Sequence, residues 1–259
     1  MDYGSHPWES GTAGRGREVT GLVDELPWDS GCFGFKVARW RGPKDFKALA
    51  AAIPALREAG IRLVYIFNPV SGEGPDAGLT GIGARWVDRR TVFSRALDGD
   101  PQSLILVHTF PAKAPSRELR ELALASGAHS RFRVDPAMPA HCFHALYEAW
   151  IRRSTMREIA DEVLVHGRAG QVRGMVTIRQ NEGVAHIGLI AVAADARGKG
   201  VGSGLVRAAE AWAFRHGASR MEVVTQGANQ EAFALYGRCG YGIKAAEDVY
   251  HLWIPPEVS

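Results

Sequence analysis

Four alternating glycines near the C-terminal end of the chain form its most distinctive pattern. Gly198 to Gly204 follow an apolar stretch that ends at Val192, and a helix is predicted to begin at Val201. Glycines let a ligand approach the backbone closely, and a helix N-terminus offers unpaired N–H groups and a partial positive charge. Arg197 and Lys199 add two full positive charges. The pattern predicts a polyphosphate site, although a simple turn would also explain Gly198 and Gly200 by themselves.

Two common phosphate loops do not match this stretch. The spacing GxxxxGK[ST] of magnesium-nucleotide sites is absent from the sequence. The dinucleotide motif GxGxxG needs an early βαβ unit and an acidic residue about 20 positions later. The glycines at 198–204 occur at every second position, which is a different spacing, and they lie late in the chain.

A second segment, at a suitable distance downstream, points to a family. Arg197-Gly-Lys-Gly200-Val-Gly202 resembles the coenzyme A loop (Q/R)xxGx(G/A) of the GNAT acetyltransferase superfamily, and Asn229-Gln-Glu-Ala-Phe-Ala-Leu-Tyr236-Gly-Arg-Cys-Gly-Tyr241 resembles its NxxAxxLYxxxGF segment. The resemblance implies a GNAT fold, acetyl-CoA as co-substrate and no metal. It also implies that the backbone of Ile190, Ala191 and Val192 holds the thioester. The implied coenzyme A contacts continue with Arg197, Gly198, Lys199, Gly200, Val201, Gly202, Ser203, Asn229 and Tyr236.

Tyr236 is the best candidate for a general acid. Acyl transfer from a thioester to an amine needs a polarised carbonyl and a proton for the departing thiolate. The resemblance implies that a backbone N–H near Val192 polarises the carbonyl. Tyr236 lies seven residues after Asn229, so both are expected on nearly the same helix face. A core tyrosine with a satisfied hydroxyl is the alternative interpretation.

The general base is less well defined by the sequence. His186 precedes Ile190 by four residues on one predicted strand, and alternation places it on the face of Gly188, Ile190 and Val192. A histidine there could accept the amine proton directly or through water. A packed or surface histidine fits the pattern equally well. Asp135, Glu182 and a chain of water molecules remain alternatives.

Two further clusters contain residue types that bind ligands in other settings. Arg131 and Arg133 flank Phe132, a combination that could hold a diphosphate and stack on a base, or could be a solvated arginine face. The His141-Cys-Phe-His144 run resembles one corner of a metal site, but no further ligands follow at a recognisable spacing. We therefore predict no metal. Cys239 has no His/Asp arrangement around it that would indicate a covalent nucleophile, so direct transfer is expected.

A narrower resemblance concerns the acceptor. Leu26-Pro-Trp28-Asp-Ser-Gly-Cys-Phe33-Gly34, Ser130-Arg-Phe-Arg133 and Trp150-Ile151 resemble the dTDP-fucosamine N-acetyltransferases. The resemblance implies acetylation of the amine of a dTDP-4-amino-4,6-dideoxy sugar, and it suggests a homodimer. Alternatives that keep the chemistry are an aminoglycoside, an amino acid or a protein N-terminus as acceptor. A non-catalytic acyl-CoA-sensing module is the alternative from another class.

The elements that must position these residues form an α/β pattern. Strands are predicted at 19–23, 33–40, 61–67, 85–93, 103–110, 162–166, 173–179, 186–192, 220–225 and 250–254, and helices at 43–60, 115–126, 139–153, 201–216 and 230–239. The simplest division is a loose tail over 1–18, a small α/β domain over 19–102 and a GNAT domain over 103–259. The Gly/Pro-rich loop 68–83 could be a mobile lid over a site or a connection that is simply longer than it needs to be.

Composition narrows the class of protein. The 259 residues carry a net charge of +3, with 46% hydrophobic and 23% charged residues, which is an ordinary globular mixture. Such a small excess of basic residues does not indicate a nucleic-acid-binding protein. We find neither a membrane-spanning stretch nor a secretory signal in these residues. Three widely separated cysteines fit a reducing cytoplasm.

Overall fold

The computed structural model describes residues 18–256 apart from 20, 44–45, 71 and 100–104. They form two compact units, which we treat separately. The larger unit consists of residues 91–129 and 147–245. The smaller unit consists of the described parts of residues 12–90, 130–146 and 246–259. No helix in these described ranges is long and apolar enough to cross a membrane.

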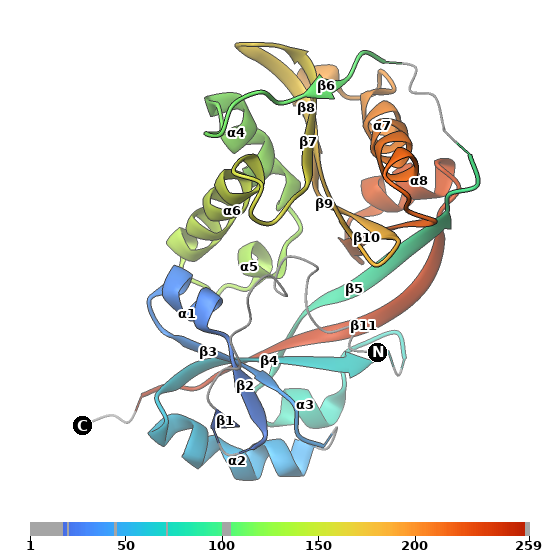
Figure 1. The fold of residues 1–259 in the computed structure, drawn as a ribbon. Coiled ribbons are helices and arrows are strands. Elements are labelled where there is room, and N and C mark those ends of the chain that lie inside the picture. The colour runs from blue at the N-terminus through green and yellow to red at the C-terminus, as the bar shows by residue number, and fades with distance from the viewer. Residues whose placement is uncertain (1–17, 20, 44–45, 71, 100–104, 257–259) are drawn as a thin grey trace. The chain divides into compact units, whose positions relative to one another are not determined.

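The larger unit is built on a mixed sheet (Figure 1). Its strand order is β5-β10-β9-β8-β7-β6. Strands β9 and β10 are parallel, whereas β6, β7, β8 and β9 pair antiparallel with their neighbours. The bounds are β5 (Arg85–Ala96), β6 (His108–Thr109), β7 (Glu162–Arg168), β8 (Gln171–Asn181), β9 (Val184–Val192) and β10 (Arg220–Gln226).

Helices cover both faces of this sheet (Figure 1). Helix α4 packs on β8 and β9, and α7 packs on β7, β8 and β9 from the other side. Small residues of α7, among them Ala209 and Ala213, let it approach Val176 and Ile187 in a continuous apolar core. The helix bounds are α4 (Arg117–Ser126), α6 (Ala140–Thr155), α7 (Val201–Arg215) and α8 (Gln230–Arg238).

Strand β9 contains a bulge in its middle. Val176 pairs with Ile190 and Ile178 pairs with Ile187, so Gly188 and Leu189 together face the single residue Thr177. The Thr177 hydroxyl accepts a hydrogen bond from the Leu189 N–H at 2.9 Å. Side chains along a strand point alternately to the two faces of the sheet. One extra residue in β9 therefore shifts every residue beyond it by one position, so that its side chain points to the opposite face from the one that simple alternation predicts.

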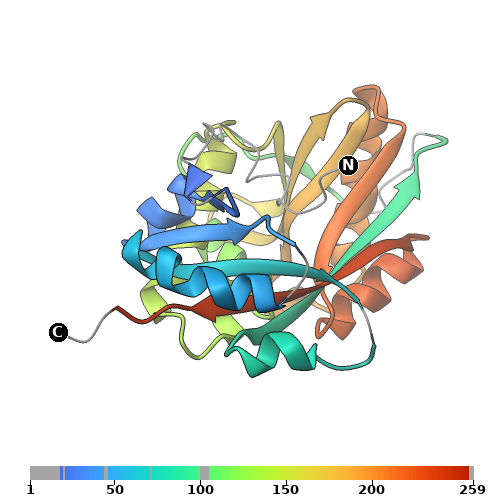
Figure 2. The same cartoon turned by 90° about the horizontal axis from the view of Figure 1, so that it is seen from below.

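The smaller unit has its own hydrophobic core. Its strand order is β1-β2-β3-β4-β11-β5, and β3 and β4 are parallel. Helix α2 connects them and lies along them (Figure 2), burying Leu49 and Leu56 against Val64 and Leu252. The bounds are β1 (Glu18–Val19), β2 (Val23–Glu25), α1 (Pro27–Phe33), β3 (Lys36–Trp40), α2 (Phe46–Glu58), β4 (Ile61–Pro69), α3 (Ala77–Gly81), α5 (Arg131–Val134) and β11 (Gly242–Trp253).

The predicted mixed α/β class is confirmed, and the structure adds three local features. The segment between the strands predicted at 19–23 and 33–40 contains helix α1, with Pro27 in the first turn where its missing N–H costs nothing. Part of the loop predicted at 68–83 is helix α3, whose N-terminal N–H groups at Gly78 and Leu79 are capped by the Asp76 carboxylate. Arg131 to Arg133, for which no element is predicted, lie in the short helix α5.

The two compact units do not follow the order of the chain. Residues 130–146 pack with the smaller unit although they lie between segments of the larger one, and β5 and β11 contribute residues to both. The single domain boundary expected between 102 and 103 stays a prediction, and those two positions lie outside the described residues. The same holds for most of the expected tail over 1–18 and for the first two residues of the strand expected at 103–110. Residues 105–110 are described, and only His108–Thr109 of them form a strand, β6.

Candidate functional site

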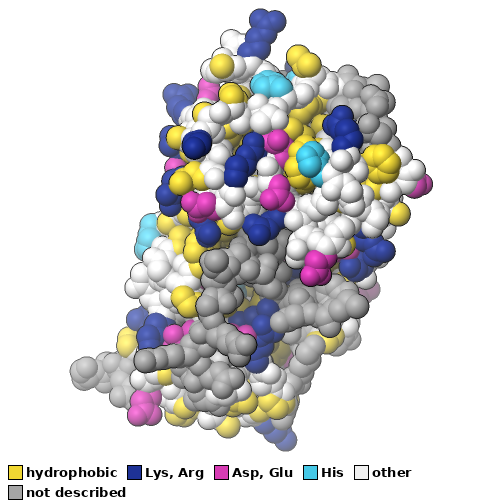
Figure 3. Space-filling view, in the orientation of Figure 1, with side chains coloured by type: hydrophobic (Ala, Val, Ile, Leu, Met, Phe, Trp, Pro, Cys, Tyr) yellow, Lys and Arg dark blue, Asp and Glu magenta, His cyan; other side chains and the backbone are white. Residues whose placement is uncertain are grey.

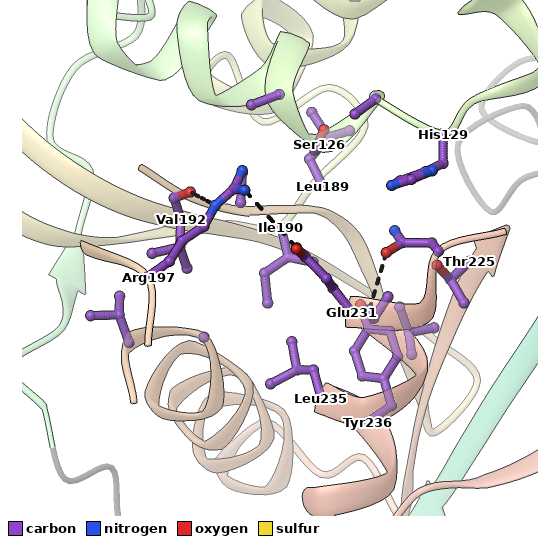
Figure 4. A pocket seen from close by; sticks show the side chains of 18 of the residues that line it. Ser126, His129, Leu189, Ile190, Val192, Arg197, Thr225, Glu231, Leu235 and Tyr236 are labelled. Carbon is purple, nitrogen blue, oxygen red and sulfur yellow. Dashed lines mark hydrogen bonds and ion pairs between the residues drawn. The ribbon is translucent and has the colours of Figure 1, made fainter. Parts of the chain in front are cut away.

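A cavity of about 780 Å³ lies within the larger unit. Its size is typical of small-molecule and cofactor sites. The cavity is lined by residues from the end of α4, from α6, from β9, from the start of α7, from the end of β10 and from α8 (Figure 4). The lining includes Ser126, His129, Tyr147, Trp150, Leu189, Ile190, Val192, Arg197, Gly200, Gly202, Thr225, Asn229, Glu231, Leu235 and Tyr236. All the predicted coenzyme A residues except Lys199 line this one cavity.

The glycine loop forms the entrance to helix α7. Gly198 and Gly200 have φ angles of 72° and 78°, in the left-handed region that glycine adopts without strain. Gly200 is the N-cap, and its carbonyl accepts the N–H of Gly204, so Gly204 begins the helical hydrogen-bond ladder. The N–H groups of the first turn, from Val201 onward, have no partner within the helix. Because Val201, Gly202 and Ser203 line the cavity, this turn is suited to hold an anion.

The charged side chains beside the loop lie in different environments. Arg197 donates from Nε to the Val192 carbonyl at 3.2 Å and approaches Glu231 to 4.0 Å (Figure 4). Lys199 does not line the cavity, because its ammonium donates to the Asp195 carbonyl at 2.9 Å. Arg197 is therefore the loop cation that the structure places at the cavity.

Strand β9 brings backbone and side chains to the cavity along Gly188 to Val192. The bulge interrupts the ladder to β8 only at Gly188 and Leu189, and Ile190, Ala191 and Val192 pair in regular register with Val176, Met175 and Gly174. Ile190 and Val192 pack toward the α7 side of the sheet. The predicted thioester segment, Ile190 to Val192, therefore lies along one wall of the cavity.

Tyr236 and Asn229 come from helix α8. Asn229 is the N-cap, and its Oδ1 accepts the Ala232 N–H at 3.1 Å. Tyr236 is 2% exposed, packs against Phe93 and Tyr241, and lines the cavity (Figure 4). Burial raises the pKa of Tyr236 above its ordinary value, so the phenol stays protonated at neutral pH and can act as a proton donor.

His186 does not share the face of Ile190 and Val192 as predicted. His186 pairs with Arg179 and Ile190 pairs with Val176, and these two β8 partners are three positions apart, so they point to opposite faces. His186 therefore lies on the sheet face opposite to Ile190, because the bulge adds one residue to β9. It does not line the cavity. Burial and Lys244 lower the pKa of His186, and Glu222 opposes that shift. Its role as base stays a prediction without geometric support.

The alternative bases do not line the cavity either. Asp135 is 2% exposed and lies in the smaller unit, where His251 Nδ1 and Trp253 Nε1 donate to it at 2.7 and 2.8 Å. Glu182 is exposed in the turn between β8 and β9 and has a φ of 50°. The lining of the cavity includes neither carboxylate.

The predicted acceptor residues lie in the core and on the surface of the smaller unit. Arg131 and Phe132 are 5% and 3% exposed, and the Arg131 guanidinium lies 4.5 Å from the centre of the Phe132 ring. Arg133 is exposed and stacks over Phe143 at 5.3 Å. The buried ring of Phe132 is not available for stacking on a base in this conformation. The binding role of these three residues stays a prediction.

The cysteine and histidine positions show no metal-binding geometry. In the described parts of the chain, no group of three or more His, Cys, Asp or Glu side chains could hold an ion. Cys142 is buried, and the ring of His144 packs edge-on against Phe143. Cys239 is 2% exposed and does not line the cavity.

Several lining residues were not identified from the sequence. They are Ser126 and His129 at the end of α4, Tyr147 and Trp150 in α6, and Thr225 in β10. None of them belongs to a spacing pattern. The available signals are that His129 directly precedes the Ser130-Arg131-Phe132-Arg133 segment and that Trp150 belongs to the Trp150-Ile151 pair of the narrower resemblance.

Comparison with known proteins agrees with this geometry. Residues 128–241 match the model of the acetyltransferase (GNAT) family. A curated relative, the dTDP-fucosamine acetyltransferase of Escherichia coli O6:H1 (strain CFT073), is 32% identical over 129 residues, which are 49% of this chain and 54% of that protein. The match thus spans about half the length of the relative.

Solved structures show the same fold at low sequence identity. A GCN5-related N-acetyltransferase from Sphaerobacter thermophilus matches with a TM-score of 0.58 and 17% identity, over 92% of this chain and 78% of its own. A conserved protein of unknown function from Staphylococcus epidermidis matches with a TM-score of 0.61 and 11% identity, over 90% and 92%. These likenesses extend over most of the chain and confirm the predicted fold. Over residues 128–241, this chain is thus similar to acetyltransferases of the GNAT family.

Proposed function

We propose that the protein moves an acetyl group from acetyl-CoA to the amine of a nucleotide-linked amino sugar. The observation that carries the transferase proposal is the convergence of the α7 N-terminus, Arg197 and Tyr236 on one cavity. The nucleotide-sugar acceptor, with a dTDP-4-amino-4,6-dideoxy sugar as the first choice, is supported by the similarity to the dTDP-fucosamine acetyltransferase. The buried Arg131 and Phe132 add no support for that acceptor.

The lining residues suit each part of the transfer. The first turn of α7 and Arg197 would hold the coenzyme A diphosphate, because unpaired N–H groups and a guanidinium both favour anionic oxygens. A backbone N–H of β9 near Val192 would polarise the thioester carbonyl. The amine nitrogen bonds to the carbonyl carbon, the carbon–sulfur bond breaks, and the Tyr236 hydroxyl gives its proton to the leaving sulfur. No covalent acyl-enzyme is needed.

The experiment is a measurement of coenzyme A release from acetyl-CoA with a panel of acceptors. The panel contains dTDP-4-amino-4,6-dideoxyhexoses of both C4 configurations, an aminoglycoside, free amino acids and a peptide with a free N-terminus. We expect turnover confined to a dTDP-amino sugar. Turnover on another acceptor alone would retain the transferase and reject the sugar nucleotide.

Tyr236→Phe tests whether the Tyr236 hydroxyl supplies the proton to the leaving sulfur. We expect kcat to fall about 100-fold or more, as is typical when a general acid is removed, with little change in coenzyme A affinity. Tyr65→Phe is the control, because Tyr65 is a buried tyrosine of the smaller unit. Tight acetyl-CoA binding by the wild-type protein without any turnover would favour an acyl-CoA sensor instead.

A further inference from the structure

We propose that His129 is the general base that accepts the proton of the attacking amine. This inference rests on the proposed acetyl transfer. A neutral amine attacks the thioester carbonyl, and the nitrogen must lose one proton as the amide forms. Tyr236 has given its own proton to the sulfur, so a second group has to take the proton from nitrogen.

The composition of the cavity lining selects His129. The titratable or charged side chains among the described lining residues are His129, Tyr147, Arg197, Glu231, Tyr236 and Arg238. Arginines stay protonated and buried phenols are poor bases at neutral pH. Only His129 and Glu231 can therefore accept a proton there.

Glu231 lies in the wrong part of the cavity for this task. Its side chain is 82% exposed, and it approaches Arg197, the cation of the glycine loop, at 4.0 Å. A carboxylate in that position faces the phosphate end of the predicted coenzyme A site. His129, in contrast, enters from the α4 side, across the cavity from the β10 end and α8, and its ring points into the cavity (Figure 4).

The local structure holds His129 in a defined place. Helix α4 is capped at Ser116 and is anchored on the sheet by the buried side chains of Leu119 and Ala123. Its last turn closes with the N–H groups of Gly127 and Ala128 donating to Leu124 and Ala125. His129 follows directly and is partly exposed, so its ring is accessible from the cavity. An imidazole is the side chain best suited to reversible proton transfer near neutral pH.

The proton balance of the step is complete with these groups. The amine nitrogen forms the bond to carbon and releases one proton to an imidazole nitrogen of His129. The thiolate takes one proton from Tyr236. The protonated imidazole and the phenolate then return to their starting forms by exchange of one proton through solvent. No metal, oxidant or further reactant is required.

The test compares His129→Ala with His108→Ala, using the acceptor of the panel that the wild-type protein acetylates. His108 is an exposed histidine of β6 that does not line the cavity. We expect His129→Ala to lower kcat about 100-fold or more while the coenzyme A Kd, measured by calorimetry, stays within about twofold. His108→Ala should match the wild-type protein in both measurements.

Chemical rescue separates a proton acceptor from a structural residue. Added imidazole should restore part of the activity of His129→Ala and none of that of Tyr236→Phe. An unchanged kcat, or a loss that imidazole does not restore and that accompanies weaker coenzyme A binding, would overturn the assignment while leaving the transferase intact. Absence of turnover by the wild-type protein with every acceptor would overturn both proposals.

Discussion

Arg197 and Glu231 are an ion pair at the place where an anionic ligand is expected. Their closest atoms are 4.0 Å apart, and the side chains are 54% and 82% exposed, so solvent screens their attraction strongly. A ligand diphosphate would compete with Glu231 for the same guanidinium. The carboxylate therefore opposes ligand binding more than it stabilises the loop.

Glu231→Gln should strengthen coenzyme A binding. Removing one negative charge beside Arg197 leaves the guanidinium to the diphosphate, and we expect the Kd to fall about two- to fivefold at low salt. The gain should shrink at 0.5 M salt, where charges more than about 5 Å apart are screened. Isothermal titration calorimetry at two salt concentrations measures this effect. Glu121→Gln on α4 is the control, because Glu121 pairs with Arg117 at 3.0 Å, outside the cavity lining, and it should change neither Kd.

At the scale of elements, the entrance to α7 depends on backbone conformation rather than on side chains. Gly200 ends the loop with a φ of 78° and starts the helix whose first N–H groups line the cavity. Gly170, in the turn between β7 and β8, has nearly the same φ of 74°. A Cβ at either position would meet no atom within 4 Å. The two glycines therefore differ only in where they lie.

This similarity gives a matched test of the glycine loop. Gly200→Ala and Gly170→Ala should each lower the free energy of unfolding by about 1 kcal/mol, because alanine is strained at positive φ. Only Gly200→Ala should weaken coenzyme A binding, by about tenfold or more, since the strained loop no longer holds the first turn of α7 in place. Urea denaturation and calorimetry provide the two readouts. Equal Kd values for the two variants would contradict the role of the loop.

At the scale of elements, a buried dyad connects strand β11 to the end of α5 in the smaller unit. His251 is fully buried, donates from Nδ1 to Asp135 and stacks on Tyr65, with the ring centres 5.1 Å apart. Burial lowers the pKa of His251 to about 4; Arg131 and Arg85 act in the same direction, and Asp135 opposes them. The neutral imidazole is therefore the form that the fold requires.

This dyad predicts a loss of stability in mild acid. Between the ordinary histidine pKa of about 6.5 and the folded value, the unfolded chain binds a proton that the folded chain does not, so the free energy of unfolding falls as pH falls. The contribution of His251 is on the order of 3 kcal/mol at most. Urea denaturation between pH 7 and 4.5 should show a shallower pH dependence for His251→Gln than for the wild-type protein. Parallel curves would contradict the prediction.

At the scale of the whole molecule, acidic and basic side chains are interspersed over the upper part of the face in Figure 3, in keeping with the net charge of +3.

The two compact units interleave along the chain. The β11 residues from Glu247 to Trp253 pair with the β4 residues from Leu63 to Pro69. The fragment 103–259 lacks β4 and β5, the two neighbours of β11, so it exposes both edges of β11 together with Tyr250 and Leu252, which are buried in the intact chain.

The fragment 103–259 should therefore be less stable than the whole chain. An exposed apolar strand edge promotes aggregation, so we expect the fragment to aggregate or to unfold without a cooperative transition. Size-exclusion chromatography and thermal unfolding, with the full chain in parallel, measure this. A monomeric fragment that unfolds cooperatively would instead support 103–259 as an autonomous domain.

The sequence by itself determined the mixed α/β class and predicted a set of coenzyme A residues, most of which line one cavity. These depend on local signals: glycines before a helix, apolar periodicity, and a capping asparagine seven residues before a tyrosine. Their geometry follows from neighbours along the chain, so the pattern at 197–203 and at Asn229 and Tyr236 was sufficient to predict one cavity wall.

Only the tertiary structure decided which side chains of other segments share that cavity. The bulge at Gly188 and Leu189 moves His186 to the opposite face, and it depends on the pairing with β8, which alternation along one strand cannot reveal. His129 lines the cavity because α4 packs on β9, about 60 residues further along the chain. Burial likewise removes Phe132 from the surface. Such placements depend on contacts between distant segments, and no local spacing encodes them.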